Sequence, residues 1–330
     1  MAVSIESLYL NNSSRSKSID PGIGVRDRGV RTDTAGKNGI IVVIPCYNEE
    51  VAIGSIVLRA LKYAEKVLVI DDGSSDNTAE VAKIAGAEVL AHGVNMGKGA
   101  CIRDAFEQVK MLSPRVVVLI DGDGQHDPDE IPDLVKPILS GEADIVNGSR
   151  FIKPNGHNVP LYRRIGQTIL TVATNFGMGR KISDTQNGFR AFSCDTLGCF
   201  SLGESGMAIE SEMLIDAAEA NLRVREVPIN VRYDVDGSTH NPIKHGFSVL
   251  NSIIILISQR RPMLFFGLPG ALFLLTGLIF IFLMLEDFNT TRTFDVFYAM
   301  ACMLSITLGA AGISTGLTLT SIHNRRTDAT

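Results

Sequence analysis

The chain has 330 residues, of which 45% are hydrophobic, and its formal net charge is −5. This length allows one large domain with an additional segment, and the charge excludes the strong basic field typical of nucleic-acid-binding proteins. Five cysteines without C-x-x-C spacing favour a reducing compartment over a disulfide framework. Residues 1–38 contain too short an apolar cluster for a signal peptide, and we expect a disordered tail there.

Residues 39–240 alternate between apolar runs and amphipathic stretches, which predicts an α/β domain with an open, Rossmann-like sheet. Strands are expected at 40–44, 67–70, 87–91 and 116–120, and helices at 51–63, 78–85 and 99–112. Further helices are expected at 163–176 and 210–221, a loop at 184–191 and a strand at 224–231. Ligands of such sheets bind beyond the carboxyl ends of the strands, where the motifs described below fall.

Two long uncharged stretches follow, at 263–285 and from about 296 to 320. Each can cross roughly 30 Å of hydrocarbon, so we expect a transmembrane helical hairpin over 263–322. An amphipathic juxtamembrane segment is expected at 241–262 and a cytoplasmic tail at 323–330. A hairpin buried in a soluble core is the alternative.

The basic residues near these stretches predict their orientation. Arg260 and Arg261 precede the first span, and Arg325 and Arg326 follow the second, whereas the polar connection at 286–292 carries a single arginine. The positive-inside rule therefore places both ends of the hairpin, and the preceding domain, in the cytoplasm.

The strongest chemical signal directly follows the strand expected at 116–120. Asp121 and Asp123 stand two residues apart on an extended turn, so both carboxylates can face one hard cation, and Gln125 can add a third oxygen. An all-oxygen ligand set favours Mg²⁺ or Mn²⁺ over zinc. An acidic surface turn is the alternative, and an EF-hand is excluded because its downstream ligands are absent.

Two further motifs also follow expected strands. Gly97 and Lys98 open the helix at 99–112, where glycine, helix-end N–H groups and a positive charge favour an anion, although an ordinary loop fits equally well. The segments 45–50 and 71–76 follow the first two strands and are expected side by side. The ring of Tyr47 with nearby carboxylates suits a nucleobase and ribose, and helix capping is the alternative.

Together these motifs resemble the family 2 glycosyltransferases of the GT-A fold, and within them the polyprenyl-phosphate sugar synthases such as dolichyl-phosphate mannose or glucose synthases. The resemblance covers about residues 39–240. It rests on Pro-x-Tyr-Asn-Glu, Asp-Asp-Gly-Ser-x-Asp-x-Thr, Asp-x-Asp-x-Gln-His and the Gly-Ser-Arg that ends at Arg150. Residues 184–190 match the acceptor-side loop of that family.

The resemblance implies a donor site, a metal site and an acceptor site. The donor nucleotide sugar would be bound by Pro45, Tyr47, Glu49, Val69, Asp71, Gly97, Lys98, Asp121, Gly122, Asp123 and Arg150. Mg²⁺ or Mn²⁺ would be held by Asp121, Asp123 and Gln125. Arg163, Arg164 and Arg232 would contact the acceptor phosphate, and Asp123, Arg150 and Arg163 would carry catalysis. Members of this family often have a lysine a few residues after the arginine that corresponds to Arg232, and this chain lacks that lysine.

The implied reaction transfers a hexose to polyprenyl or dolichyl phosphate by metal-assisted inverting displacement, for protein or surface glycosylation. UDP-glucose or UDP-N-acetylglucosamine is the favoured donor, with GDP-mannose second. The lipid phosphate is already ionised near neutral pH and needs no general base, so His126 is expected to be structural. The alternatives are a processive polysaccharide synthase, whose Gln-x-x-Arg-Trp signature needs a tryptophan that this chain lacks, a non-catalytic nucleotide-binding membrane protein, and a nucleotidyltransferase.

Overall fold

The computed structural model describes residues 39–152, 161–202, 208–232 and 242–327, with side chains left out at 161–165, 242–245 and 323–327. The tail expected at 1–38 and the domain boundary expected at 240 lie outside these residues.

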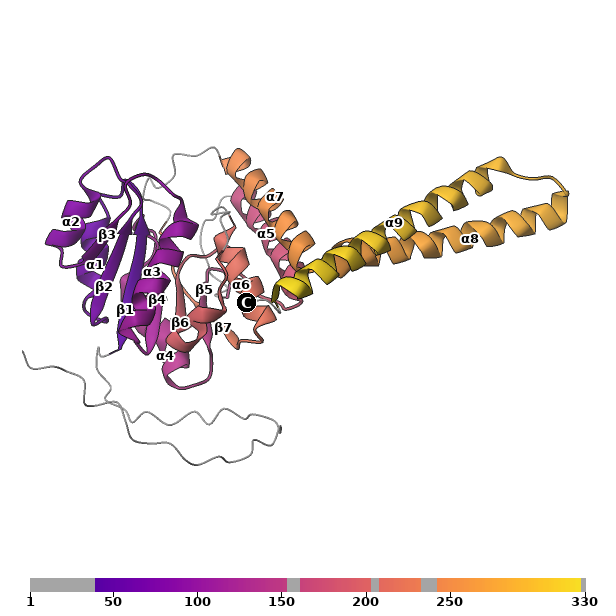
Figure 1. Cartoon of the computed structure of the whole chain (residues 1–330). Coiled ribbons are helices and arrows are strands. Elements are labelled where there is room, and N and C mark those ends of the chain that lie inside the picture. The colour runs from indigo at the N-terminus through magenta and orange to yellow at the C-terminus, as the bar shows by residue number, and fades with distance from the viewer. Residues whose placement is uncertain (1–38, 153–160, 203–207, 233–241, 328–330) are drawn as a thin grey trace, which may run out of the picture. The chain divides into compact units, whose positions relative to one another are not determined.

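A seven-stranded mixed sheet forms the centre of the α/β domain (Figure 1). The strands run in the order β3-β2-β1-β4-β6-β5-β7, and all are parallel except β6, which is antiparallel to both of its neighbours. Their bounds are β1 Ile40–Cys46, β2 Lys66–Asp71, β3 Glu88–Ala91, β4 Val116–Leu119, β5 Ile145–Ser149, β6 Arg190–Ser193 and β7 Val224–Pro228.

Nine α-helices lie in the described part of the chain. They are α1 Ile53–Ala60, α2 Thr78–Ile84, α3 Lys98–Leu112, α4 Ile131–Leu139, α5 Leu161–Met178, α6 Ile209–Glu219, α7 Pro242–Arg260, α8 Leu268–Thr291 and α9 Val296–Thr327. A π-helical segment, Met263–Gly267, leads directly into α8.

The sheet is covered on both faces, which explains the continuous β-branched run in β1. Val42 and Ile44 pack in one cluster with residues of α1 and α4. Ile41 and Val43 point the other way, into a second cluster with residues of α3 and α6. Successive side chains of a strand face opposite sides, so a strand between two helical layers must be apolar throughout. The predicted α/β fold is confirmed.

The second half of the domain departs most from the expected elements. The loop expected at 184–191 ends in β6, because its last residues pair with β4 and β5. No element was predicted for α4 or β5. The strand expected at 224–231 ends earlier, and Val231 forms only an isolated bridge with His126. Such errors are typical where long-range pairing decides the structure.

Two helical segments, Met263–Thr291 and Val296–Ile322, are long and apolar enough to cross a membrane by length and composition. They form a hairpin of apolar helices that fits the expectation, but the polar connection predicted at 286–292 is largely helical, since α8 continues through Thr291. The hydroxyl groups of Thr290 and Thr291 bond to the carbonyl of Asp287 (2.9 and 2.8 Å), which keeps the polar end of the helix satisfied.

Candidate active site

The loops that follow β1 and β2 are joined by hydrogen bonds between backbone N–H groups and side chains. The N–H of Asn48 donates to Ser74 Oγ (2.9 Å), and the N–H of Ser75 donates to Asn48 Oδ1 (2.8 Å). The N–H of Glu49 donates to Thr78 Oγ1 (2.7 Å). The expected adjacency of the two motifs is confirmed, and the two loops form one braced surface at the strand ends.

The residues predicted to bind the nucleotide occupy different depths of this surface. Pro45 lies within β1, and the side chain of Tyr47, which follows that strand, is 47% exposed. Asp71 is buried, and its carboxylate accepts the N–H of Ser74 at 3.2 Å. Val69 is fully buried within β2 and packs in the hydrophobic core, so the structure does not bring its side chain to the strand ends.

The loop after β4 packs tightly against the end of β1. A Cβ on Gly122 would lie 2.9 Å from Cys46 Cβ and 3.3 Å from the carbonyl oxygen of Pro45, so only glycine fits there. Asp123 Oδ1 accepts the N–H of Gln125 at 3.0 Å. The three residues predicted to bind a metal thus lie on one short loop that packs against the end of β1.

Negative charge accumulates at this point. Burial and the neighbouring carboxylates, first Asp123 and then Asp76 and Asp121, raise the pKa of Glu49 to about 7. Burial and Asp121 also raise the pKa of Asp123. Like-charged carboxylates that share a partly dehydrated site disfavour full ionisation unless a cation balances them. The donor set, made only of oxygen atoms, is therefore chemically suited to a hard divalent cation.

Lys98 supplies positive charge from the first residue of α3. Its Nζ lies 2.6 Å from Asp121 Oδ1 and 2.7 Å from Glu210 Oε1. Burial acts to raise the pKa of Asp121, but attraction to Lys98, with smaller contributions from His126 and Arg190, holds that pKa below its usual range. Lys98 therefore reaches the acidic loop after β4.

The N–H groups before α3 are already bonded within the protein. Gly97 has a φ of +90°, a conformation that favours glycine, and its N–H donates to Asp72 Oδ2 at 2.7 Å. The N–H of Met96 donates to Asp72 Oδ1 at 2.8 Å. Asp72 therefore accepts the N–H groups of the two residues that precede α3, and the anion site expected at the N–H groups of the helix end itself stays a prediction.

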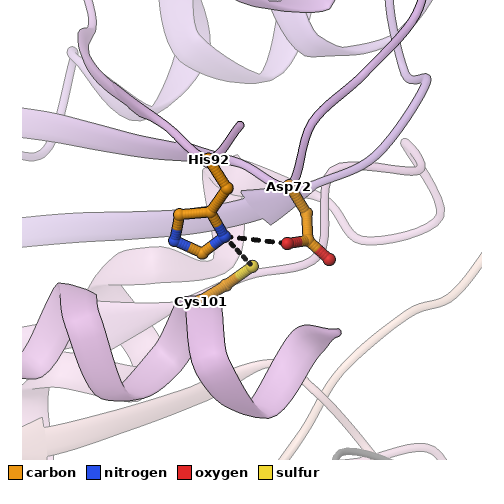
Figure 2. Close-up of side chains that lie close together, drawn as sticks. All are labelled: Asp72, His92 and Cys101. Atoms are coloured by element: carbon orange, nitrogen blue, oxygen red, sulfur yellow. Dashed lines mark hydrogen bonds and ion pairs between the residues drawn. The ribbon is translucent and has the colours of Figure 1, made fainter. Parts of the chain in front are cut away.

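Asp72 belongs to a buried group with His92 and Cys101 (Figure 2). His92 Nδ1 lies 2.8 Å from Asp72 Oδ1 and 4.0 Å from Cys101 Sγ, and His92 Nε2 lies 3.2 Å from Asp104 Oδ2. These contacts tie β2, β3 and the start of α3 together, and they fix the backbone from which Lys98 extends.

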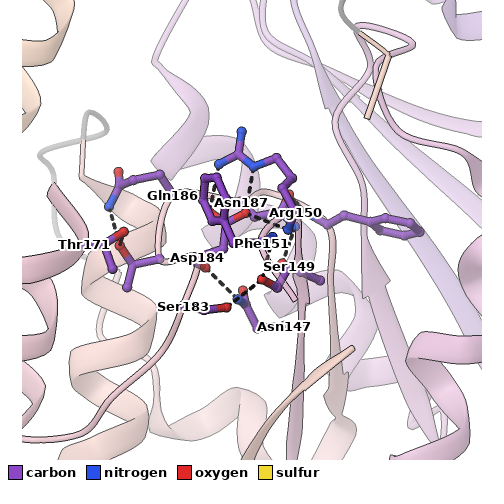
Figure 3. Close-up of polar contacts among 12 residues, drawn as sticks. Asn147, Ser149, Arg150, Phe151, Thr171, Ser183, Asp184, Gln186 and Asn187 are labelled. Atoms are coloured by element: carbon purple, nitrogen blue, oxygen red, sulfur yellow. Dashed lines mark hydrogen bonds and ion pairs between the residues drawn. The ribbon is translucent and has the colours of Figure 1, made fainter. Parts of the chain in front are cut away.

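The other half of the site is organised around Asp184, which is almost fully buried (Figure 3). Arg150 grips this carboxylate with two parallel hydrogen bonds, from Nε to Oδ2 (2.6 Å) and from Nη2 to Oδ1 (2.8 Å). The backbone N–H of Arg150 donates to the same carboxylate at 3.1 Å. Bidentate pairs of this kind are strong and directional, so they set the position of the predicted acceptor-side loop.

The three arginines predicted to contact the acceptor phosphate lie in less fully described segments. Arg163 and Arg164 belong to the first turn of α5, where side chains lie outside the described part. Arg232 is exposed, and its backbone N–H donates to the carbonyl of Gln125 at 2.9 Å. This bond brings Arg232 next to the loop that follows β4.

Two charged residues of the site were not assigned a role from the sequence. Glu210, in the first turn of α6, contacts Lys98 as described above. Arg190 is fully buried and donates to the backbone carbonyls of Asn187 (2.9 Å), Glu210 (2.7 Å) and Thr185 (2.9 Å). Burial lowers its pKa to about 10. Arg190 could have been noticed because it is a charged residue at the end of the Asp184 to Arg190 motif. Nothing in the sequence around Glu210 indicates a role for it.

His126 has the structural character expected from the sequence. It is buried, its ring centroid lies 5.3 Å from that of Phe189, and burial lowers its pKa to about 4. The ring is therefore neutral near pH 7 and packs behind the acidic loop.

Comparison with known proteins decides the family. The sequence model described as glycosyl transferase family 2 matches residues 41–200. The UDP-N-acetylglucosamine–dolichyl-phosphate N-acetylglucosaminyltransferase of Methanococcus voltae is 30% identical over 240 residues, covering 66% of this chain and 95% of the relative. The chain belongs to glycosyl transferase family 2. This family 2 enzyme is also 34% identical over 224 residues to the uncharacterized protein MJ1222 of Methanocaldococcus jannaschii, covering 66% of this chain and 92% of that protein.

Solved structures agree with the GT-A fold of this glycosyltransferase. Glucosyl-3-phosphoglycerate synthase from Mycobacterium tuberculosis in complex with phosphoglyceric acid has a TM-score of 0.52 and 26% identity, covering 68% of this chain and 80% of that chain. Its complex with Mn²⁺, uridine diphosphate and glucosyl-3-phosphoglycerate has a TM-score of 0.51 and 25% identity over the same shares.

Proposed function

We propose that this family 2 glycosyltransferase transfers a hexose from a nucleotide sugar to polyprenyl or dolichyl phosphate, for protein or surface glycosylation. The observation that carries the proposal is the group of carboxylates Glu49, Asp121 and Asp123, in a chain that also contains an apolar helical hairpin. Relatives with the names dolichyl-phosphate hexose transferase (Haloferax volcanii, 29% identical) and undecaprenyl-phosphate mannosyltransferase (Micrococcus luteus, 30% identical) support the acceptor class.

The acidic loop after β4 would hold Mg²⁺ or Mn²⁺ through Asp121, Asp123 and Gln125. The raised pKa values of Glu49 and Asp123 support a bound cation there, and a relative of the same fold crystallised with Mn²⁺. When bound, a divalent cation neutralises charge on the departing nucleoside diphosphate. Pro45, Tyr47, Glu49 and Asp71 would hold the base and ribose, and Lys98 would add positive charge near the diphosphate.

The acceptor phosphate would be the nucleophile. One of its anionic oxygens forms the new bond to the anomeric carbon, while the bond from that carbon to the diphosphate oxygen breaks, so the anomeric centre inverts. Arg163, Arg164 and Arg232 would orient the acceptor, and no side chain has to remove a proton. Catalysis would then depend on positioning and charge stabilisation.

Uridine diphosphate sugars are the favoured donors. One relative is named for UDP-N-acetylglucosamine, and uridine diphosphate is present in the structurally similar synthase. GDP-mannose is the second candidate, supported by a polyprenol monophosphomannose synthase of Mycolicibacterium smegmatis that is 30% identical. The arginines beside the spans favour a membrane protein whose domain at 39–240 faces the cytoplasm, with the hairpin at 263–322.

A transfer assay with the full chain in detergent tests the proposal. Radiolabelled UDP-glucose, UDP-N-acetylglucosamine or GDP-mannose is supplied with Mn²⁺ and polyprenyl phosphate. Asp123→Ala should lower lipid-linked product on the order of 100-fold or more, because charge stabilisation of the leaving group is lost. EDTA should have the same effect on the unaltered enzyme.

The matched control is Asp133→Ala, which removes an exposed carboxylate of α4 and should leave transfer unchanged. Full activity of the Asp123 variant would refute the proposed site. Release of pyrophosphate from UTP and a sugar 1-phosphate, without any need for lipid, would instead favour a nucleotidyltransferase.

A further inference from the structure

The ammonium group of Lys98 stands where a cation bound to Asp121 would be expected. It contacts Asp121 Oδ1 at 2.6 Å and Glu210 Oε1 at 2.7 Å. The three side chains, Lys98, Asp121 and Glu210, remain 29%, 25% and 15% exposed, so they line an accessible part of the site. Lys98 therefore divides one positive charge between a predicted metal ligand and a carboxylate with no other assigned role.

The backbones that carry these side chains are held firmly. Lys98 follows Gly97, whose N–H is bonded to Asp72. The backbone carbonyl of Glu210 accepts a hydrogen bond from the buried Arg190. Redistribution of the ammonium between its two partners thus needs only side-chain rotation, not movement of α3 or α6.

Asp121 has little room to move away from Lys98. A Cβ built on Gly188 would lie 2.3 Å from Asp121 Oδ2, so the loop of Gly188 closes one side of the carboxylate. Divalent cations bind carboxylate oxygens at about 2.0–2.6 Å. A cation on Asp121 and an ammonium on the same oxygen would repel one another strongly, and one of them must leave.

We propose that the ammonium group of Lys98 competes with a divalent cation for Asp121. Glu210 is the positioning residue that holds the Lys98 ammonium when the divalent cation binds. The inference rests on the proposed function, because it requires a cation site at Asp121 and Asp123. Without the carboxylate of Glu210, Asp121 is the one remaining charged partner of Lys98 among the described residues, and Lys98 competes more strongly with the metal ion. When Lys98 is replaced, removing the charge of Glu210 should not change the affinity for the divalent cation.

Direct Mn²⁺ binding tests this exchange without any turnover. Free Mn²⁺ is measured by electron paramagnetic resonance against the full chain in detergent, with no donor present. Glu210→Gln, which keeps the shape but removes the charge, should weaken Mn²⁺ binding roughly tenfold, whereas Lys98→Met should tighten it by a similar factor. The double variant should bind like Lys98→Met alone.

The double variant separates the exchange from simpler roles. If Glu210 acted directly on the metal or only supported the fold, Glu210→Gln would weaken binding equally with and without Lys98, and the inference would be wrong. Lys98→Gln repeats the test with a polar side chain should the methionine variant be unstable. Lys110→Met, on the exposed face of the same helix, should bind Mn²⁺ like the unaltered chain.

The outcomes also separate this inference from the proposed function. If the unaltered chain binds no Mn²⁺, both are wrong. If the unaltered chain binds Mn²⁺ and Asp123→Ala abolishes binding, the proposed cation site at Asp121 and Asp123 is supported. Unchanged affinities in the Lys98 and Glu210 variants would then overturn this inference alone.

Discussion

In the half of the sheet formed by β3, β2, β1 and β4, site residues follow the strands, and neighbouring loops bond through backbone N–H groups, as at Asn48 and Ser74. In the half formed by β6, β5 and β7, the site depends on buried charged groups such as Arg150, Asp184 and Arg190. The first arrangement uses contacts available to short polar residues near strand ends. The second needs partners that are brought together only by the complete fold.

This contrast has an energetic consequence. Hydrogen bonds of exposed loops exchange readily with water, so each contributes little to stability. A buried charge that loses its partner leaves an uncompensated group in a poorly solvated place, which is far more costly. We therefore expect substitutions in the β5–β7 half to act on folding, and substitutions in the β1–β4 half to act on binding and pH response.

The sharpest test of the contrast is Arg190→Met. The substitution leaves three backbone carbonyls, two of them in buried hydrogen bonds, without their donor, and the free energy of unfolding should fall by about 3 kcal/mol or more. Thermal unfolding of the full chain in detergent measures the effect. Arg225→Met, which removes an exposed ion pair with Glu142, should cost less than about 1 kcal/mol. Equal effects of the two variants would contradict the contrast.

Gly188→Ala probes the contact between the two halves. The added methyl group would lie 2.3 Å from Asp121 Oδ2 and must displace that carboxylate. Sugar transfer should fall on the order of 100-fold, since small misplacements of site groups have such effects. Gly198→Ala is the matched control, because nothing lies within 4 Å of its added Cβ. Normal transfer by the Gly188 variant would show that the position of Asp121 is not critical.

The last test concerns the pH dependence of stability in EDTA. Glu49 has a pKa of about 7 in the folded chain, against about 4.3 for an unfolded glutamate. Between these values the folded state binds more protons than the unfolded state, so stability should fall as pH rises from about 4 to 7. Unfolding temperatures measured across this range should fall less in Glu49→Gln. If the unaltered chain and Glu49→Gln showed the same dependence of unfolding temperature on pH, the raised pKa of Glu49 would be contradicted.

The sequence was sufficient to predict the first half of the domain because its signals are local. The strand expected at 40–44, which continues to Cys46 in the structure, the acidic turn at Asp121 and the adjacency of the two loops follow from apolar runs and from short motifs at strand ends. Neither β6 nor the role of Glu210 could be predicted in this way. The strand β6 exists because it pairs with β4 and β5, and Glu210 meets Lys98, which is 112 residues away in the chain.

The apolar hairpin constrains the route of a lipid substrate. A Cβ on Gly270 would lie 2.9 Å from the carbonyl oxygen of Gly309, and a Cβ on Gly277 would lie 2.7 Å from the side chain of Ile306. Helices in such close contact leave no space for an isoprenoid tail between them. If polyprenyl phosphate is the acceptor, its hydrocarbon tail has to run along the outer surface of the pair, so substitutions there, rather than at the glycines, would alter chain-length preference.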